Sequence, residues 1–314
     1  MIKKIIIMNR VVFSIILVCF VFSTGITQQL SNSTHLTESR VVLNPAFTAT
    51  GTELIMNGLF RLQWLGFTGA PFSGITTLQY PIKKYNMSVG GILHFDKTGP
   101  ISKAGVQLNY AYKLKQFLSR YGQLSLGISG DFQQYSFNGS DLIYNDNNDL
   151  LINTGKNGRF FTSFGSGFYY LSNTREFKEN TFFVGASVSQ IFTTKVLVNE
   201  FDQTRLRHVH FNVGGRFYNY DTFLEPMITA NIVKPDIIDV LYGLKFEKED
   251  TFWAGLGYAS SGTVAFQGGI ILDKFGNKLS KLRIGGLASW GVGTSIAKAG
   301  PGFEFYIGYA LDTN

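Results

Sequence analysis

The chain has 314 residues and a formal net charge of +7, and only 16% of its residues are charged, against about 25% in an average soluble domain. The basic residues are scattered along the chain, which argues against a nucleic-acid partner, because such partners need a clustered basic footprint. After residue 25 there is no apolar run long enough for a membrane-spanning helix.

The first 25 residues have the order of features found in a secretory signal peptide. Lys3, Lys4 and Arg10 precede an apolar run over residues 11–22, and small residues follow at 23–25. A membrane-spanning helix is the alternative, but the run is shorter than the roughly 20 residues that a bilayer core requires. We therefore predict that residues 1–25 are removed on export.

Cleavage would change both the charge and the chemistry of the mature chain. It removes three of the 28 basic residues and none of the 21 acidic ones, so the balance becomes 25 minus 21, or +4. It also removes Cys19, the only cysteine. The mature chain then has no thiol for a disulfide, a thiolate metal site or a cysteine nucleophile.

Residues 26–51 precede the first predicted strand, and we expect them to form an N-terminal arm fixed at the Asn44-Pro45 turn. From residue 52 onward the dominant pattern has a period of two. Leu124, Leu126 and Ile128, for example, alternate with small or polar residues, so one face of that segment is apolar. Fourteen segments follow this pattern, near residues 52–64, 72–80, 86–96, 101–112, 122–134, 159–171, 181–193, 206–219, 224–234, 240–248, 251–260, 262–273, 279–292 and 302–311.

The length of these segments separates a membrane barrel from a soluble sandwich. Soluble strands average about 5–6 residues, whereas a tilted membrane strand needs roughly 9–11, and most of the predicted strands reach that length. A closed sheet also pairs every backbone polar group inside the bilayer. We therefore predict an all-β protein, with residues 52–314 forming an antiparallel transmembrane β-barrel of about 14 strands in the outer membrane.

Connector lengths predict an orientation. If the mature N-terminus lies in the periplasm, the long connectors at 135–158 and 194–205 face outward, and short ones such as 81–85 and 249–250 face the periplasm. Long outer loops and short periplasmic turns are the usual arrangement in outer-membrane barrels.

The sequence contains no clear motif for catalysis or metal binding. His208 and His210 share one face of a strand, as two metal ligands would, but no third ligand is evident. The Asp- and Asn-rich segment 141–149 could supply oxygen ligands for calcium or could be an ordinary surface loop. No nucleophile elbow occurs, since Gly165-Ser166-Gly167 lies within a predicted strand. We expect no catalytic residues, no bound metal and no cofactor.

One set of motifs resembles a known family. It begins with Asn44-Pro45-Ala46 and continues into the first strand and the connector after it. Together these segments resemble the N-terminal signature of the PorP/SprF family of type IX secretion system membrane proteins, and the resemblance extends over nearly the whole mature chain. The residues that carry it, and that we expect to form a partner-binding or structural motif, are Asn44, Pro45, Arg61, Gln63, Trp64, Gly66, Phe67, Gly69 and Pro71.

The resemblance implies a non-enzymatic outer-membrane component of type IX secretion and gliding. Such a protein would support export or surface anchoring of adhesin-like cargo and would contact other secretion components, including a periplasmic subunit linked to peptidoglycan. Within the motif, Arg61 falls on the polar face of its strand, so we expect it to pair inside the lumen and to position the arm near Asn44. The alternatives are that the motif only closes the barrel, and that the protein is a channel for small molecules or fatty acids.

Overall fold

A computed structural model gives the fold of the chain. It describes residues 40–65, 69–138, 156–174, 179–192, 195–198, 201–204, 206–234, 237–276, 280–292 and 300–312. The predicted signal peptide, the arm before residue 40, Gly66, Phe67 and the Asp- and Asn-rich segment 141–149 lie outside these ranges.

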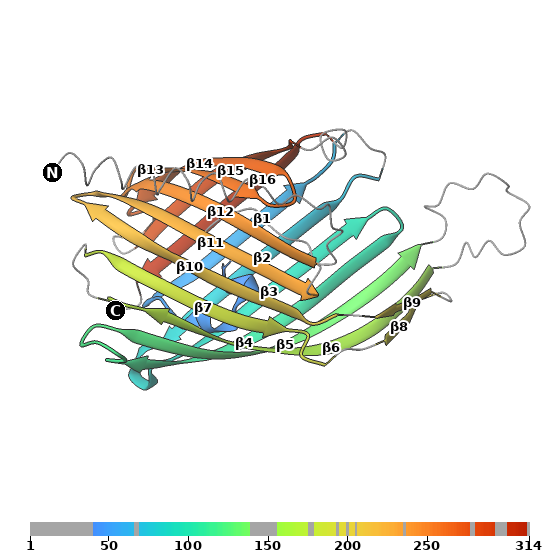
Figure 1. The fold of residues 1–314 in the computed structure, drawn as a ribbon, viewed down its shortest axis with the longest axis horizontal. Coiled ribbons are helices and arrows are strands. Elements are labelled where there is room, and N and C mark those ends of the chain that lie inside the picture. Colours follow the sequence, from blue (N-terminus) through green and yellow to red (C-terminus); the bar gives the residue numbers. More distant parts are fainter. Residues whose placement is uncertain are drawn as a thin grey trace, which may run out of the picture.

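Fourteen antiparallel strands form a closed barrel (Figure 1), as the alternation predicted. Each strand pairs with its neighbours along the chain, and β1 pairs with β16 to close the sheet. The barrel strands are β1 (Glu53–Leu62), β2 (Phe72–Ile82), β3 (Met87–Thr98), β4 (Ile101–Lys115), β5 (Gln123–Asn138), β6 (Lys156–Leu171), β7 (Thr181–Ser189), β10 (His208–Asn219), β11 (Thr222–Lys234), β12 (Ile237–Lys248), β13 (Phe252–Ala259), β14 (Thr263–Asp273), β15 (Ser280–Gly291) and β16 (Gly302–Asp312).

The two long predicted connectors are more ordered than expected. β5 continues to Asn138 and β6 begins at Lys156, so the predicted connector 135–158 shortens from both sides. The predicted connector 194–205 contains a separate two-stranded sheet of β8 (Lys195–Val198) and β9 (Phe201–Thr204). Figure 1 shows this hairpin at the barrel end where β5 and β6 reach farthest. The extension of β5 was missed because Gln134, Ser136 and Asn138, which continue the outward row of Ile128 and Phe132, are polar and interrupt the apolar face.

We name the two barrel ends by their connectors. The loop end is where β5 finishes and β6 begins, and it carries the β8–β9 hairpin; the turn end carries short connectors such as 220–221 and 249–251. Because β1 begins and β16 finishes at the turn end, the described part of the N-terminal arm joins the barrel wall there. The predicted orientation would place the turn end in the periplasm.

Outward and inward faces differ as a membrane barrel requires. Outward side chains are large and apolar, with 57% of Leu93, 60% of Ile128 and 50% of Phe164 exposed. Inward neighbours such as Ser88 and Ser125 are fully buried. An apolar outer band and a polar interior are the pattern of outer-membrane barrels.

Among the residues that the structure describes, helical structure is limited to short pieces, and none of them is long and apolar enough to cross a membrane. Two of these pieces, α2 (Arg40–Leu43) and the 3-10 helix η1 (Pro45–Ala49), belong to the arm, and η2 (Lys83–Tyr85) is a turn between β2 and β3. The arm pieces pack against the inner face of the barrel, where Ala46 and Ala49 are completely buried. The lumen is therefore occupied by the protein's own N-terminal arm.

Candidate functional site

The centre of the candidate site is the Asn44 turn, which both ends α2 and starts η1. The Asn44 Oδ1 accepts a hydrogen bond from the Ala46 N–H at 3.0 Å, and Pro45 occupies the first helical position. The Asn44 Nδ2 donates to the Phe168 carbonyl at 2.9 Å and to the Ala186 carbonyl at 3.4 Å. One side chain thus shapes the arm and fastens it to β6 and β7.

Wall side chains satisfy the arm's backbone carbonyls on both sides of that turn. The Ser187 hydroxyl donates to the Leu43 carbonyl at 2.6 Å, and the Gln123 amide donates to the Ala49 carbonyl at 3.1 Å. The Lys113 ammonium donates to the Gly51 carbonyl. Since buried carbonyls are costly unless paired, these wall residues are matched to this arm conformation.

Glycines in the wall let the arm approach the sheet. A Cβ on Gly127 would lie 2.3 Å from the Ala46 nitrogen, and one on Gly167 would lie 2.4 Å from the Asn44 Oδ1. Any larger residue would occupy space that the arm fills. These glycines serve close backbone approach, which is a recognised use of glycine in strand interiors.

A buried ion pair anchors the start of the arm. The Arg40 guanidinium pairs with the Glu225 carboxylate on β11 and lies 4.4 Å from the ring centre of Phe183. Arg216 on β10 binds the other Glu225 oxygen at 2.7 Å. With two arginines around it, the carboxylate of Glu225 is compensated inside the wall, as a buried charge must be.

The charged groups continue around the lumen. Lys245 lies opposite Glu225 in the strand register and contacts the Glu247 carboxylate at 3.0 Å, and Arg283 binds both Glu247 oxygens at 2.9 and 2.6 Å. Bidentate pairs of this kind are among the stronger charged contacts in proteins. They fix the wall on the side of the lumen opposite β5 and β6.

The second half of the sequence motif lies at the loop end. Arg61 points into the lumen, as its strand face predicted, and pairs with Glu304 on β16 at 3.3 Å. The Gln63 N–H donates to the Pro71 carbonyl at 3.0 Å, and Gly69 turns with a φ of +78°. Trp64 has a φ of +54° and is 43% exposed. This half closes the first hairpin and the β1–β16 seam.

The structure does not bring the two halves of the motif together. Asn44 and Pro45 contact the wall at β5, β6 and β7, whereas Arg61 joins β1 to β16, and β2, β3 and β4 lie between these places. The ion pair that ties the arm to the wall is formed by Arg40 with Glu225 instead. Sequence reasoning missed this pair, although an acidic residue on the inner face of an otherwise apolar strand is a usable signal.

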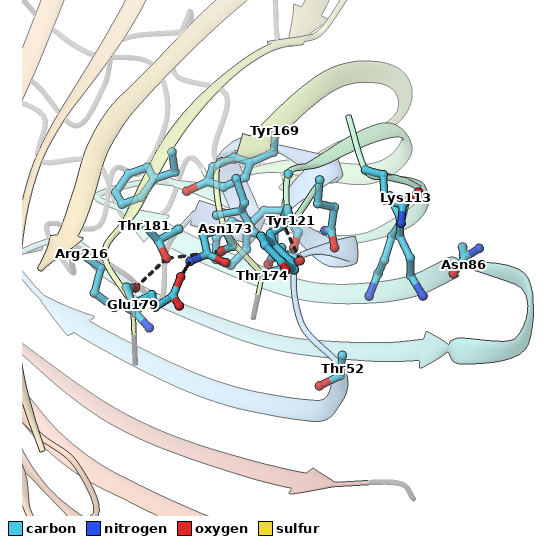
Figure 2. A pocket seen from close by; sticks show the side chains of 18 of the residues that line it. Thr52, Asn86, Lys113, Tyr121, Tyr169, Asn173, Thr174, Glu179, Thr181 and Arg216 are labelled. Atoms are coloured by element: carbon cyan, nitrogen blue, oxygen red, sulfur yellow. Dashed lines mark hydrogen bonds between the residues drawn. The ribbon is translucent and has the colours of Figure 1, made fainter. Parts of the chain in front are cut away.

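The arm separates two cavities. On the turn-end side Arg40, Phe47 and Thr50 line a space of about 1140 Å³, part of which Figure 2 shows. On the loop-end side Val42 and Leu43 line a smaller space of about 110 Å³. Arm residues form a wall of both, so the arm stands between the two ends of the lumen.

The histidine pair does not form a metal site within the described ranges. His208 and His210 lie parallel with ring centres 6.2 Å apart, and the His210 Nδ1 contacts the Asn231 Oδ1 at 2.7 Å. No group of three His, Cys, Asp or Glu side chains suited to a metal occurs among the residues that the structure describes. The segment 141–149, which could supply oxygen ligands for calcium, lies outside the described residues.

Comparison with protein families identifies relatives by sequence. The family model described as type IX secretion system membrane protein PorP/SprF matches residues 26–309. No curated protein matches.

Solved structures resemble the chain in fold. The CymD monoaromatic hydrocarbon channel has a TM-score of 0.53 at 10% identity, and the match covers 88% of this chain and 93% of that one. A Pseudomonas aeruginosa FadL homologue has a TM-score of 0.49 at 10% identity, covering 86% of this chain and 93% of that one. The likeness to CymD, at that identity, concerns the barrel fold alone. This chain has an apolar outer belt, a closed sheet and a match to an outer-membrane family, and together these place it in the cell outer membrane.

Proposed function

Since the chain belongs to the PorP/SprF family of type IX secretion system membrane proteins, we propose that it is a plugged, non-enzymatic docking component of that system. In this proposal the loop end holds secreted adhesin-like cargo at the cell surface. The turn end faces the periplasm and contacts other secretion subunits, including one linked to peptidoglycan. Cargo export and gliding would then depend on both ends of one rigid barrel.

The observation that carries this proposal is the arm in the lumen. It is held by wall hydrogen bonds at Leu43, Asn44 and Ala49 and by the buried Arg40–Glu225 pair. A solute channel benefits from an open path, whereas a docking component benefits from a stable barrel with two fixed ends. The fit of wall glycines to the arm supports the second use.

The test is co-purification of the tagged protein from detergent-solubilised outer membranes, followed by mass spectrometry of the bound proteins. We expect secretion subunits and a cargo protein with a C-terminal sorting domain. In a deletion strain, export of such cargo should fail and should return on complementation. Normal export in the deletion strain would contradict the proposal.

A transport channel for small molecules or fatty acids is the second candidate, because the two cavities lie on opposite sides of the arm and an arm movement would join them. Solute flux through purified protein in liposomes decides between the two. A barrel that purifies without partners and passes solutes would favour the channel.

A further inference from the structure

The larger cavity opens among the short connectors of the turn end (Figure 2). Its lining combines the arm with β4, β6, β10 and β11, with the connector 116–122, and with Asn173, Thr174 and Glu179 between β6 and β7. Its volume of about 1140 Å³ exceeds the roughly 300–1,000 Å³ of ordinary small-molecule pockets. A space of this size fits a segment of polypeptide better than a single ion or headgroup.

The charge of the lining is unbalanced. Six basic residues face three acidic ones, Glu179, Glu225 and Glu249, which leaves a formal charge of +3. The six basic residues are Arg40, Lys83, Lys113, Lys115, Arg120 and Arg216. Because low-dielectric walls focus the field of such groups, the cavity attracts anions from solution.

Three of these cations lack a carboxylate partner within the described ranges. Arg40 and Arg216 share Glu225, and Lys83 pairs with Asp312 at 3.0 Å. For Lys113, Lys115 and Arg120, no acidic oxygen of the described residues lies within 4.0 Å.

Of these three cations, Lys113 is the strongest evidence that the cavity binds an anionic ligand. Only 7% of it is exposed, and its ammonium donates to the neutral Gly51 carbonyl. A buried cation without an anion is costly.

Aromatic and amide groups complete the lining. Phe47 comes from the arm and Tyr121 from the connector between β4 and β5, while Asn86, Gln116 and Gln123 offer amide donors and acceptors. Aromatic rings receive apolar side chains, and amides pair with a backbone. We propose that this cavity binds an acidic peptide segment with interspersed aromatic residues, supplied by a partner protein at the turn end.

This inference rests on the proposed function only in taking the partner to be a periplasmic secretion subunit. The binding itself is a property of the purified barrel and can be measured without secretion. Export assays test the docking function, and peptide binding tests the cavity, so the failure of either is recognised separately.

The experiment is a fluorescence-anisotropy titration of the full-length barrel in detergent. The probe is a short labelled peptide rich in aspartate, glutamate and phenylalanine, and its lysine-substituted counterpart is the control. We expect the acidic peptide to bind and to weaken as salt is raised, because charged contacts are screened. Equal binding of the lysine peptide would overturn the inference.

Variants locate the binding. We expect Lys113→Gln to weaken the acidic peptide at least about tenfold, as loss of a buried partner does, and Lys115→Gln with Arg120→Gln to weaken it further. Lys248→Gln is the matched control, since Lys248 lies at the same barrel end and outside the cavity lining. Retention of the folded, heat-modifiable gel band checks each barrel. Unchanged binding in the folded triple variant would overturn the inference.

Competition experiments distinguish a peptide site from a phosphate site and from a lipid-headgroup site. Inorganic phosphate and phosphatidylglycerol added as mixed detergent micelles should leave the labelled peptide bound at concentrations matched in charge. Displacement by phosphate would make the cavity a simple anion site, and displacement by the lipid would make it a headgroup site. Either result contradicts a peptide site.

Discussion

At the residue scale, Asn44 joins three tasks in one side chain. It caps η1 through the Ala46 N–H and bonds two carbonyls of neighbouring wall strands. An aspartate would keep the cap but could not donate to the carbonyls, and a serine is too short to reach both. Asparagine alone offers acceptor and donor on one planar group, which explains its place in the motif.

We expect Asn44→Ala to destabilise the barrel by about 1–3 kcal/mol, since it removes a helix cap and leaves buried groups unpaired. The measurement is urea unfolding in detergent, with intrinsic tryptophan fluorescence as the signal. Asn173→Ala is the control, because the Asn173 side chain is only half-buried and its hydrogen bond to Glu179, at 2.7 Å, lies at the surface, and it should change stability by less than about 0.5 kcal/mol. Equal effects of the two substitutions would refute the assigned role.

The wall glycines allow a sharper substitution. Gly127→Val should expel the arm while leaving the barrel closed, because even a Cβ would lie 2.3 Å from the Ala46 nitrogen. Gly91→Val is matched to it, since a Cβ there meets nothing within 4 Å. Limited proteolysis, with fragments read by mass spectrometry, should cut the arm of the Gly127 variant and spare that of the Gly91 variant. Protection of both arms would show that the arm does not need this glycine.

At the element scale, the start of the arm is held to β11 by a contact that joins residues 185 apart in sequence. Glu225 and Met227 both contact Arg40, and the stacked Phe183 belongs to β7. The position of this single short helix therefore depends on side chains from β7, β10 and β11, which are neighbours in the sheet but distant from the arm in sequence.

A double-mutant cycle on Arg40→Met and Glu225→Gln measures that dependence. We expect Glu225→Gln to lose about 3–5 kcal/mol, because it leaves the buried Arg40 without its carboxylate. Arg40→Met should lose less, because Arg216 still pairs with Glu225, and the double variant should lose less than the sum. The exposed pair Lys83–Asp312 is the control, with side chains 37% and 33% exposed, and its coupling should be no more than about 1 kcal/mol. Additive losses at Arg40 and Glu225 would show that the ion pair does not stabilise the arm.

Prediction from sequence succeeded where lipid imposes a repeat. The predicted strand 302–311 corresponds to β16, which ends one residue later at Asp312. The predicted strand 181–193 corresponds to β7, which begins at Thr181 and ends four residues earlier, at Ser189. Pairing across the lumen obeys no such repeat. Arg61 was predicted to point inward from its face alone, but its partner Glu304 depends on closure of the sheet between β1 and β16, and the arm's partner Glu225 depends on where the arm lies in the lumen.

At the scale of the whole molecule, the lipid-facing belt and the plugged lumen set separate requirements on the same strands. Ile128 on β5 is 60% exposed to the surroundings, and its neighbour Gly127 faces the arm. We expect Ile128→Lys to cost about 2–4 kcal/mol in a bilayer, the range for a charge near the midplane. Unfolding from phosphatidylcholine vesicles measures it, with Ile128→Ala as the uncharged control, and equal losses would place this residue outside the bilayer.

The arm's role as a plug is tested by conductance. The arm stands between the cavity of about 1140 Å³ and that of about 110 Å³, so the full-length protein should pass little current in planar bilayers. Gly127→Val and a deletion of residues 40–50 should both raise the single-channel conductance, and Gly91→Val should not, because only the first two changes remove the obstruction. A large current through the unmodified protein would mean that the arm leaves an open path, and it would favour the channel over the docking component.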